Sequence, residues 1–161
     1  QKNYFYAIDI LKNSNLELVI YGDGSLKKEL INYARKNGVA LEIMDPLENE
    51  KLKNIYSKYK VYLSTSAYEG NSKTILEAMS AGCVVFGSNI YNNKELFEYE
   101  NGVLINLKEQ KFETILSKIN HFLEIDSIQP DESINAIKYV KDNNSLNKYI
   151  LSILNDAKSI I

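Results

Sequence analysis

The sequence has very few of the side chains that most metal centres and disulfide frameworks use. Cys83 is the only cysteine and His121 the only histidine among 161 residues, and tryptophan is absent. One cysteine excludes an intramolecular disulfide, argues against a cysteine-based zinc site and fits a reducing compartment. We therefore expect no metal and no cofactor.

Excess charge of either sign and long apolar runs are also missing. Nineteen basic and 21 acidic residues give a net charge of −2, and no block of like charge occurs. This balance provides no basic face for nucleic acid or anionic lipid. No apolar run approaches the ~20 residues that cross a bilayer. A length of 161 residues with 45% hydrophobic residues predicts one globular domain with its own core.

Short apolar runs alternate with segments that repeat apolar residues every three or four positions. The runs predict strands at residues 16–21, 39–44, 61–64, 84–87 and 103–105. The periodic segments predict helices at 3–12, 25–37, 52–59, 74–81, 93–99, 112–123, 133–140 and 146–160. We expect Ser25 to cap the second helix and Gly38 to end it.

This alternation predicts the α/β fold class, with a parallel sheet covered by helices on both faces. In such sheets ligands bind outside the carboxyl ends of the strands. The loops that follow the strands are therefore the places to search for chemistry.

The loop after the third predicted strand carries the strongest functional signal. Gly70 allows the backbone to approach a ligand closely, and either Asn71 or Ser72 can cap the helix that follows. With Lys73 beside them, the free N–H groups at this helix start predict a site for a phosphate or diphosphate.

Two glutamates frame this loop. Glu77 lies one to two turns inside the helix, where its carboxylate can accept two hydrogen bonds from a vicinal diol such as a ribose. Glu69 can orient sugar hydroxyls or stabilise positive charge at an anomeric carbon. The spacing alone is equally satisfied by a solvated loop glutamate and a second one on the helix face.

The order of several motifs resembles a known family. Glu69 and Glu77, followed by Ala78-Met79, Ala81-Gly82 and Val84-Val85, resemble the E-x7-E signature of retaining glycosyltransferases of family 4, also called group 1, with the GT-B fold. Other segments resemble the family in the same order: residues 18–30 with Gly22-Asp23-Gly24, residues 55–66, Lys94-Glu95-Leu96, and Asn101-Gly102-Val103-Leu104.

The resemblance implies a fold and a place in it. The family has two Rossmann-like domains that face each other across a cleft, and residues 1–161 resemble the C-terminal, donor-binding one. We therefore expect a doubly wound parallel sheet in three αβα layers with extra C-terminal helices. The N-terminal, acceptor-binding domain is expected outside this sequence.

The resemblance also implies roles for individual residues. Glu69 is expected to contact the transferred sugar as the catalytic residue, and Glu77 to bind the ribose of the nucleotide. Lys2 and the stretch after Glu69 are expected to hold the diphosphate, the stretch being Gly70, Asn71, Ser72, Lys73 and Thr74. Gly22 is expected to line the cleft, with the base against the loop that contains Asp45 and Leu47.

The function implied is metal-independent transfer of a hexose, with retained configuration, from a nucleoside diphosphate sugar to a glycan or lipid-linked acceptor. The isolated domain is expected to bind donor and to be inactive in transfer. We expect it in the cytoplasm, or peripheral at the inner face of the membrane through the other domain. Two alternatives remain open: a non-enzymatic nucleotide-binding or assembly module, and a sugar-nucleotide epimerase.

Three features depart from the family pattern. The chain opens with Gln1-Lys2-Asn3 and no initiator methionine, so we expect a piece of a longer protein. Relatives carry a strand ending in Gly-Arg before the lysine, and without it the neighbouring strands are expected to have unpaired edges. Arg35, the only arginine, is expected on a surface helix. Ser72 and Lys73 replace the usual small or apolar residues of the signature.

Two reactive side chains are set aside. His121 is expected on the surface of a peripheral helix, far from the strand ends. Cys83 enters a strand after a helix-ending glycine and is expected in the core.

Overall fold

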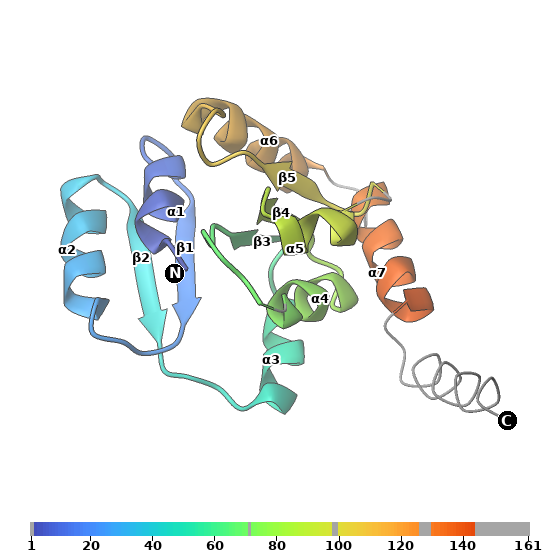
Figure 1. Ribbon diagram of the computed structural model, residues 1–161. Coiled ribbons are helices and arrows are strands. Elements are labelled where there is room, and N and C mark those ends of the chain that lie inside the picture. Colours follow the sequence, from blue (N-terminus) through green and yellow to red (C-terminus); the bar gives the residue numbers. More distant parts are fainter. Residues whose placement is uncertain (1, 71, 98–99, 126–129, 144–161) are drawn as a thin grey trace, which may run out of the picture.

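The structure is a computed structural model that describes residues 2–70, 72–97, 100–125 and 130–143 (Figure 1). Its strands are β1 (Glu17–Tyr21), β2 (Ala40–Met44), β3 (Val61–Ser64), β4 (Val84–Ser88) and β5 (Val103–Ile105). Its helices are α1 (Tyr4–Ile10), α2 (Lys27–Lys36), α3 (Asn49–Tyr56), α4 (Lys73–Ser80), α5 (Tyr91–Lys94), the 3-10 helix η1 (Glu95–Phe97), α6 (Phe112–Glu124) and α7 (Asp131–Asn143).

Every strand pair in the described residues is parallel, as the alternation of strands and helices predicts. β1 pairs with β2 so that Leu18 lies beside Leu41. β4 lies between β3 and β5 and places Val84 beside Val61 and Phe86 beside Val103. These pairings form two separate sheets, of two and three strands. The predicted α/β class with parallel strands is confirmed. The described strands form two sheets, and no strand pair joins β1 to β3.

Two apolar clusters build the core and define three layers. One cluster joins α1, α2 and α6 to one face of the strands; its fully buried members include Ile8, Phe86 and Ile115. The other joins α4 and α7 to the opposite face through Ile75, Met79, Val85 and Ala136. β4 is buried along its whole length, and because successive side chains of a strand point to opposite faces, Val84 and Phe86 join the first cluster and Val85 joins the second. The first cluster spans both sheets and holds them together.

Most predicted elements match the structure, although most helix starts differ from the prediction by one to three residues. The predicted ranges of β3 and β5 agree residue for residue with the observed strands. Ser25 is not a cap: α2 begins at Lys27, whose N–H donates to Gly24 O at 3.1 Å, so Ser25 lies inside the preceding turn. Gly38 follows α2 with φ 67°, a left-handed conformation that suits glycine, as expected for a helix stop.

The helix after β4 begins earlier than the sequence predicts. α5 starts at Tyr91 and passes into η1, whereas the pattern predicts a helix from 93 to 99. As a result Asn93 lies inside α5 with a fully buried side chain. The predicted helix at 146–160 lies outside the described residues. Among those that are described, no helix is long and apolar enough to span a membrane.

A cavity of about 500 Å³ separates the two sheets. Consecutive residues 16–21 and 61–66 line it. Because successive side chains of a strand point to opposite faces, lining by consecutive residues means that the strand edges face the cavity. Leu11, Leu52, Ile55 and Ile119 close it from the helices, and Lys2, Thr65 and Ser66 lie at its polar end.

The close approach of β4 and β5 to η1 predicts a sensitive glycine. A Cβ at Gly102 would lie 2.7 Å from the Val85 carbonyl oxygen and 2.7 Å from Phe97 Cε1. We expect Gly102→Ala to lower the free energy of unfolding by about 1–3 kcal/mol, the usual cost of overpacking. Urea unfolding measures the change. Gly24→Ala is the matched control, because nothing lies within 4 Å of its Cβ position. Equal stabilities of the two variants would contradict the packing described.

Candidate functional site

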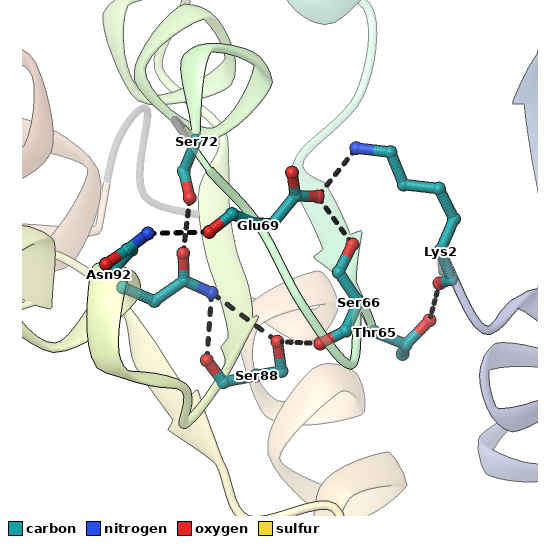
Figure 2. Close-up of polar contacts among 8 residues, drawn as sticks. Lys2, Thr65, Ser66, Glu69, Ser72, Ser88 and Asn92 are labelled. Carbon is teal, nitrogen blue, oxygen red and sulfur yellow. Dashed lines mark hydrogen bonds and ion pairs between the residues drawn. The ribbon is translucent and has the colours of Figure 1, made fainter.

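The centre of the candidate site is the carboxylate of Glu69 in the loop after β3. This side chain is buried, with the residue only 8% exposed, although it carries charge. Glu69 Oε1 accepts a hydrogen bond from Ser66 Oγ at 2.6 Å and one from Lys2 Nζ at 2.6 Å (Figure 2). Oε2 receives no hydrogen bond from the part of the chain that the structure describes, so it keeps its acceptor capacity for a ligand.

Thr65 fixes the main chain that carries Lys2. Its Oγ1 lies 3.1 Å from Lys2 O and 3.0 Å from Asn3 O, and its single proton is shared between these two carbonyls. Asn3 adopts a left-handed φ of 52°, which asparagine tolerates better than most residues. The start of α1 is therefore tied to the end of β3, and this contact brings Lys2 to Glu69 across 67 residues of sequence.

The net effect of these contacts is an acidic carboxyl. Burial raises the pKa of Glu69, but the hydrogen bonds from Lys2 and Ser66 and the positive charge of Lys2 outweigh it. The pKa of Glu69 is therefore lowered, and the group is ionised at neutral pH. An ionised, immobilised carboxylate can accept hydrogen bonds from hydroxyl groups or stabilise nearby positive charge.

A buried polar chain supports the loop from the side of β4 and α5. Ser72 Oγ donates to Asn93 Oδ1, Asn93 Nδ2 donates to Ser88 O at 2.9 Å, and Ser88 Oγ donates to Ser66 O at 2.6 Å. All four side chains are buried, so each bond satisfies a group that is removed from water (Figure 2). This network fixes both ends of the loop between β3 and α4.

Ser72, one of the two residues predicted to cap α4, does not cap the helix with its hydroxyl. Ser72 does occupy the N-cap position of α4, but it makes no side-chain capping bond. Its hydroxyl is instead directed into the protein toward Asn93. Sequence reasoning missed Asn93 and Ser88, because no motif or spacing marks a side chain that bonds across two elements.

The remaining residues of the signature segment lie at and after the start of α4. Lys73 is the first residue of α4 and is exposed, with its Nζ 3.6 Å from Glu77 Oε1. Gly70 is exposed, and Glu77 is half-buried. Thr74 lines the cavity together with Lys2. Asn71 lies outside the described residues.

The other predicted binding residues lie at the carboxyl ends of β1 and β2. Gly22 N–H donates to Met44 O at 3.0 Å, which extends the ladder by one bond. Asp45 is exposed and Leu47 half-buried. Across the described ranges, no hydrogen bond or ion pair joins these three residues to Lys2 or Glu69. The contacts of the structure therefore bring together Lys2, Ser66 and Glu69, and leave the predicted base-binding loop on the neighbouring sheet.

Two reactive side chains lie away from this site. His121 is exposed on α6, as expected. Cys83 is fully buried, and burial raises the pKa of its thiol to about 11, so the thiol stays protonated at neutral pH. Within the described residues, no group of three or more His, Cys, Asp or Glu side chains lies in position to hold a metal ion.

The family now follows from comparison with known proteins. The family model for glycosyl transferases group 1 matches residues 1–141, which is most of the chain. The chain belongs to this family. Its Glu69 and Glu77 are thus part of a group 1 glycosyltransferase domain, as their spacing and the residues around them predict.

Related proteins are longer than this group 1 domain. The GtfA subunit of a UDP-N-acetylglucosamine–peptide N-acetylglucosaminyltransferase from Limosilactobacillus reuteri is 32% identical over 94 residues, which cover 57% of this chain and 18% of that protein. The corresponding subunit of Streptococcus agalactiae is 34% identical over 88 residues, which cover 53% of this chain and 17% of that protein. The chain therefore matches less than a fifth of the length of either relative.

Solved structures agree with the Rossmann-like GT-B fold. HepE of Anabaena, solved in complex with UDP, superposes with a TM-score of 0.85 over 98% of this chain and 45% of that one, at 20% identity. This likeness confirms the expected fold class for the group 1 domain.

The contacts of Glu69 predict how its pKa responds when Lys2 is removed. In Lys2→Ala, burial still raises the pKa of Glu69 while the main opposing contact is lost, so the pKa should rise. Because the pKa is lowered in the folded chain, the contact with Lys2 stabilises the fold above the ordinary carboxyl range and loses this effect as the pH falls. Carbon-detected NMR titration of the glutamates measures the shift.

Lys73→Ala is the matched control, since Lys73 pairs with Glu77. It should leave the pKa of Glu69 unchanged. A Glu69 pKa that is the same in wild type and Lys2→Ala would show that the two side chains do not interact in solution.

Proposed function

We propose that residues 1–161 form the donor-binding domain of a retaining, metal-independent glycosyltransferase that transfers a hexose from a nucleoside diphosphate sugar. The observation that carries the proposal is the pairing of Lys2 with Glu69 in the loop that leads into α4. It places a cation and an immobilised carboxylate next to a helix start, where N–H groups favour anions.

Each group has a role in the proposed reaction. Lys2 and the amides at the start of α4 neutralise the charge that develops on the departing diphosphate. Glu69 positions the sugar and stabilises the oxocarbenium-like state at the anomeric carbon. Lys2 has three N–H donors, so it can contact a phosphate oxygen while it still holds Glu69. Glu77, half-buried on α4, accepts hydrogen bonds from the ribose.

The donor we propose carries uridine diphosphate. Two relatives are named as GtfA subunits of a UDP-N-acetylglucosamine–peptide N-acetylglucosaminyltransferase, and HepE has been solved with UDP-glucose. Because the matched relatives are much longer than this chain, we place acceptor binding in a separate N-terminal domain of the same protein. We propose a glycan or lipid-linked acceptor and a cytoplasmic location, in solution or at the inner face of the membrane.

We also propose that a further parallel strand, from outside residues 1–161, occupies the cavity between β1 and β3. Two strand edges with unpaired main-chain groups face this cavity, and the helix residues Leu11, Leu52, Ile55 and Ile119 give it apolar walls. One inserted strand would pair with both edges and join the two sheets into one.

Binding of nucleotide sugars tests the proposed function. The chain should bind UDP-glucose or UDP-N-acetylglucosamine saturably below millimolar concentration in calorimetry, and bind GDP- and ADP-sugars more weakly. No saturable binding of any member of this panel at millimolar ligand would favour a non-enzymatic assembly module.

In the full-length protein, Glu69→Ala should lower kcat about 10²-fold or more, as removal of a charge-stabilising group does. Turnover near that of the wild type would refute the role of Glu69.

Hydrogen exchange tests the inserted strand. Amides of β1 and β3 should exchange more slowly in the full-length protein than in residues 1–161, because their free edges gain partners. The outer edge strand β2 provides the internal control and should change little, since the cavity lies on the other side of β1. Equal exchange of β1 and β3 in both proteins would mean that the cavity stays open.

A further inference from the structure

Asn92, on the exposed side of α5, makes a pair of contacts with the main chain of the loop between β3 and α4. Its Nδ2 donates to Glu69 O at 2.6 Å and to Gly70 O at 3.0 Å. Figure 2 shows the Asn92 amide against the main chain of Glu69, away from the carboxylate end that faces Ser66 and Lys2. Glu69 is thus held at its carboxylate by one set of groups and at its carbonyl by another.

Because the peptide group is planar, these contacts also fix the direction of the N–H group that follows the carbonyl. In a trans peptide the carbonyl and the following N–H point in opposite directions. Because Asn92 holds the Glu69 carbonyl toward α5, the Gly70 N–H is directed away from α5. Gly70 is exposed, and nothing lies within 4 Å of its Cβ position. Within the described part of the chain its N–H donates to no acceptor, so among these residues it is an oriented donor without a partner.

The neighbouring Asn93 has a different task. Its side chain is fully buried and bonds Ser72 and Ser88, so its loss would leave buried polar groups unpaired. Asn92 is exposed, and water can replace its contact with the exposed Gly70 carbonyl. Replacement of Asn92 should therefore affect the orientation of the loop more than the stability of the fold.

We propose that Asn92 is a positioning residue for the donor diphosphate. It holds the Glu69–Gly70 peptide so that the Gly70 N–H is presented to a phosphate oxygen, and it touches no ligand itself. This inference rests on the proposed function, because it takes the acceptor of the Gly70 N–H to be a phosphate oxygen of the donor. It adds a residue of α5 to a site whose other groups come from the start of α1, the loop after β3 and α4.

The test compares UDP with uridine in NMR titrations of residues 1–161. In the wild type, UDP should shift the Gly70 amide proton downfield, whereas uridine, which lacks the diphosphate, should not. Asn92→Ala should weaken UDP binding about tenfold, the worth of one typical hydrogen bond, and abolish the Gly70 shift. Uridine affinity should be unchanged, which a general distortion of the site would not allow.

Two further variants sharpen the test. Asn92→Asp keeps the size of the side chain but removes the N–H donor, so it should lose at least as much UDP affinity as Asn92→Ala. Asn135→Ala is the matched control: the Asn135 amide on α7 also donates to a carbonyl, that of Glu100, at 3.4 Å. It should leave UDP binding unchanged. Thermal unfolding should give similar Tm values for all three variants and the wild type.

The outcomes separate this inference from the function on which it rests. If the wild type binds no UDP, the proposed function fails. If the wild type binds UDP but Asn92→Ala and Asn92→Asp bind it with wild-type affinity, the positioning role of Asn92 is overturned. An equal loss of UDP and uridine affinity in these variants would also overturn it, since the effect would then be structural.

Discussion

The contact between Lys2 and Glu69 is the interaction on which the candidate site depends. A buried carboxylate is costly unless it is paired and hydrogen-bonded, and Glu69 has both an ammonium and a hydroxyl partner on one oxygen. Lys2 reaches Glu69 because Thr65 ties the start of α1 to the end of β3. The site is therefore assembled from the start of α1 and the loop after β3. Apolar packing alone would not fix the positions of its polar groups.

The loop between β3 and α4 is shaped mainly by elements that follow it in the sequence. Ser88 at the end of β4 and Asn92 and Asn93 on α5 bond its main chain or its ends. A helix start is usually capped by the side chain of its own N-cap residue. Here the N-cap residue bonds α5 instead, so the N-cap position of α4 carries no side-chain capping bond. This arrangement leaves the N–H groups at the start of α4 without competition from a capping hydroxyl.

The sequence predicts the fold well where local pattern and burial coincide. β3 and β5 are short apolar runs between polar segments, and their bounds are confirmed. The glutamate spacing together with the ordered motifs around it predicts the family, which is also confirmed. Pattern fails where a long-range bond decides. Ser72 is a residue type that commonly caps helices, yet its hydroxyl donates to Asn93 instead. α5 begins two residues before its predicted start. The division of the strands into two sheets depends on pairing partners, which periodicity does not describe.

The charges of the site explain how an acidic chain can be suited to an anionic ligand. A free carboxylate at Glu69 would repel a diphosphate, but Lys2 on the same oxygen offsets its charge, and Lys73 does the same for Glu77. In the proposed site, attraction depends on oriented N–H groups at Gly70 and at the start of α4 rather than on net positive charge. Dipoles of this kind act over a few ångströms, so they select a ligand that fits against the loop. A pI near 5.5 and the absence of a basic face are therefore compatible with the diphosphate site proposed here.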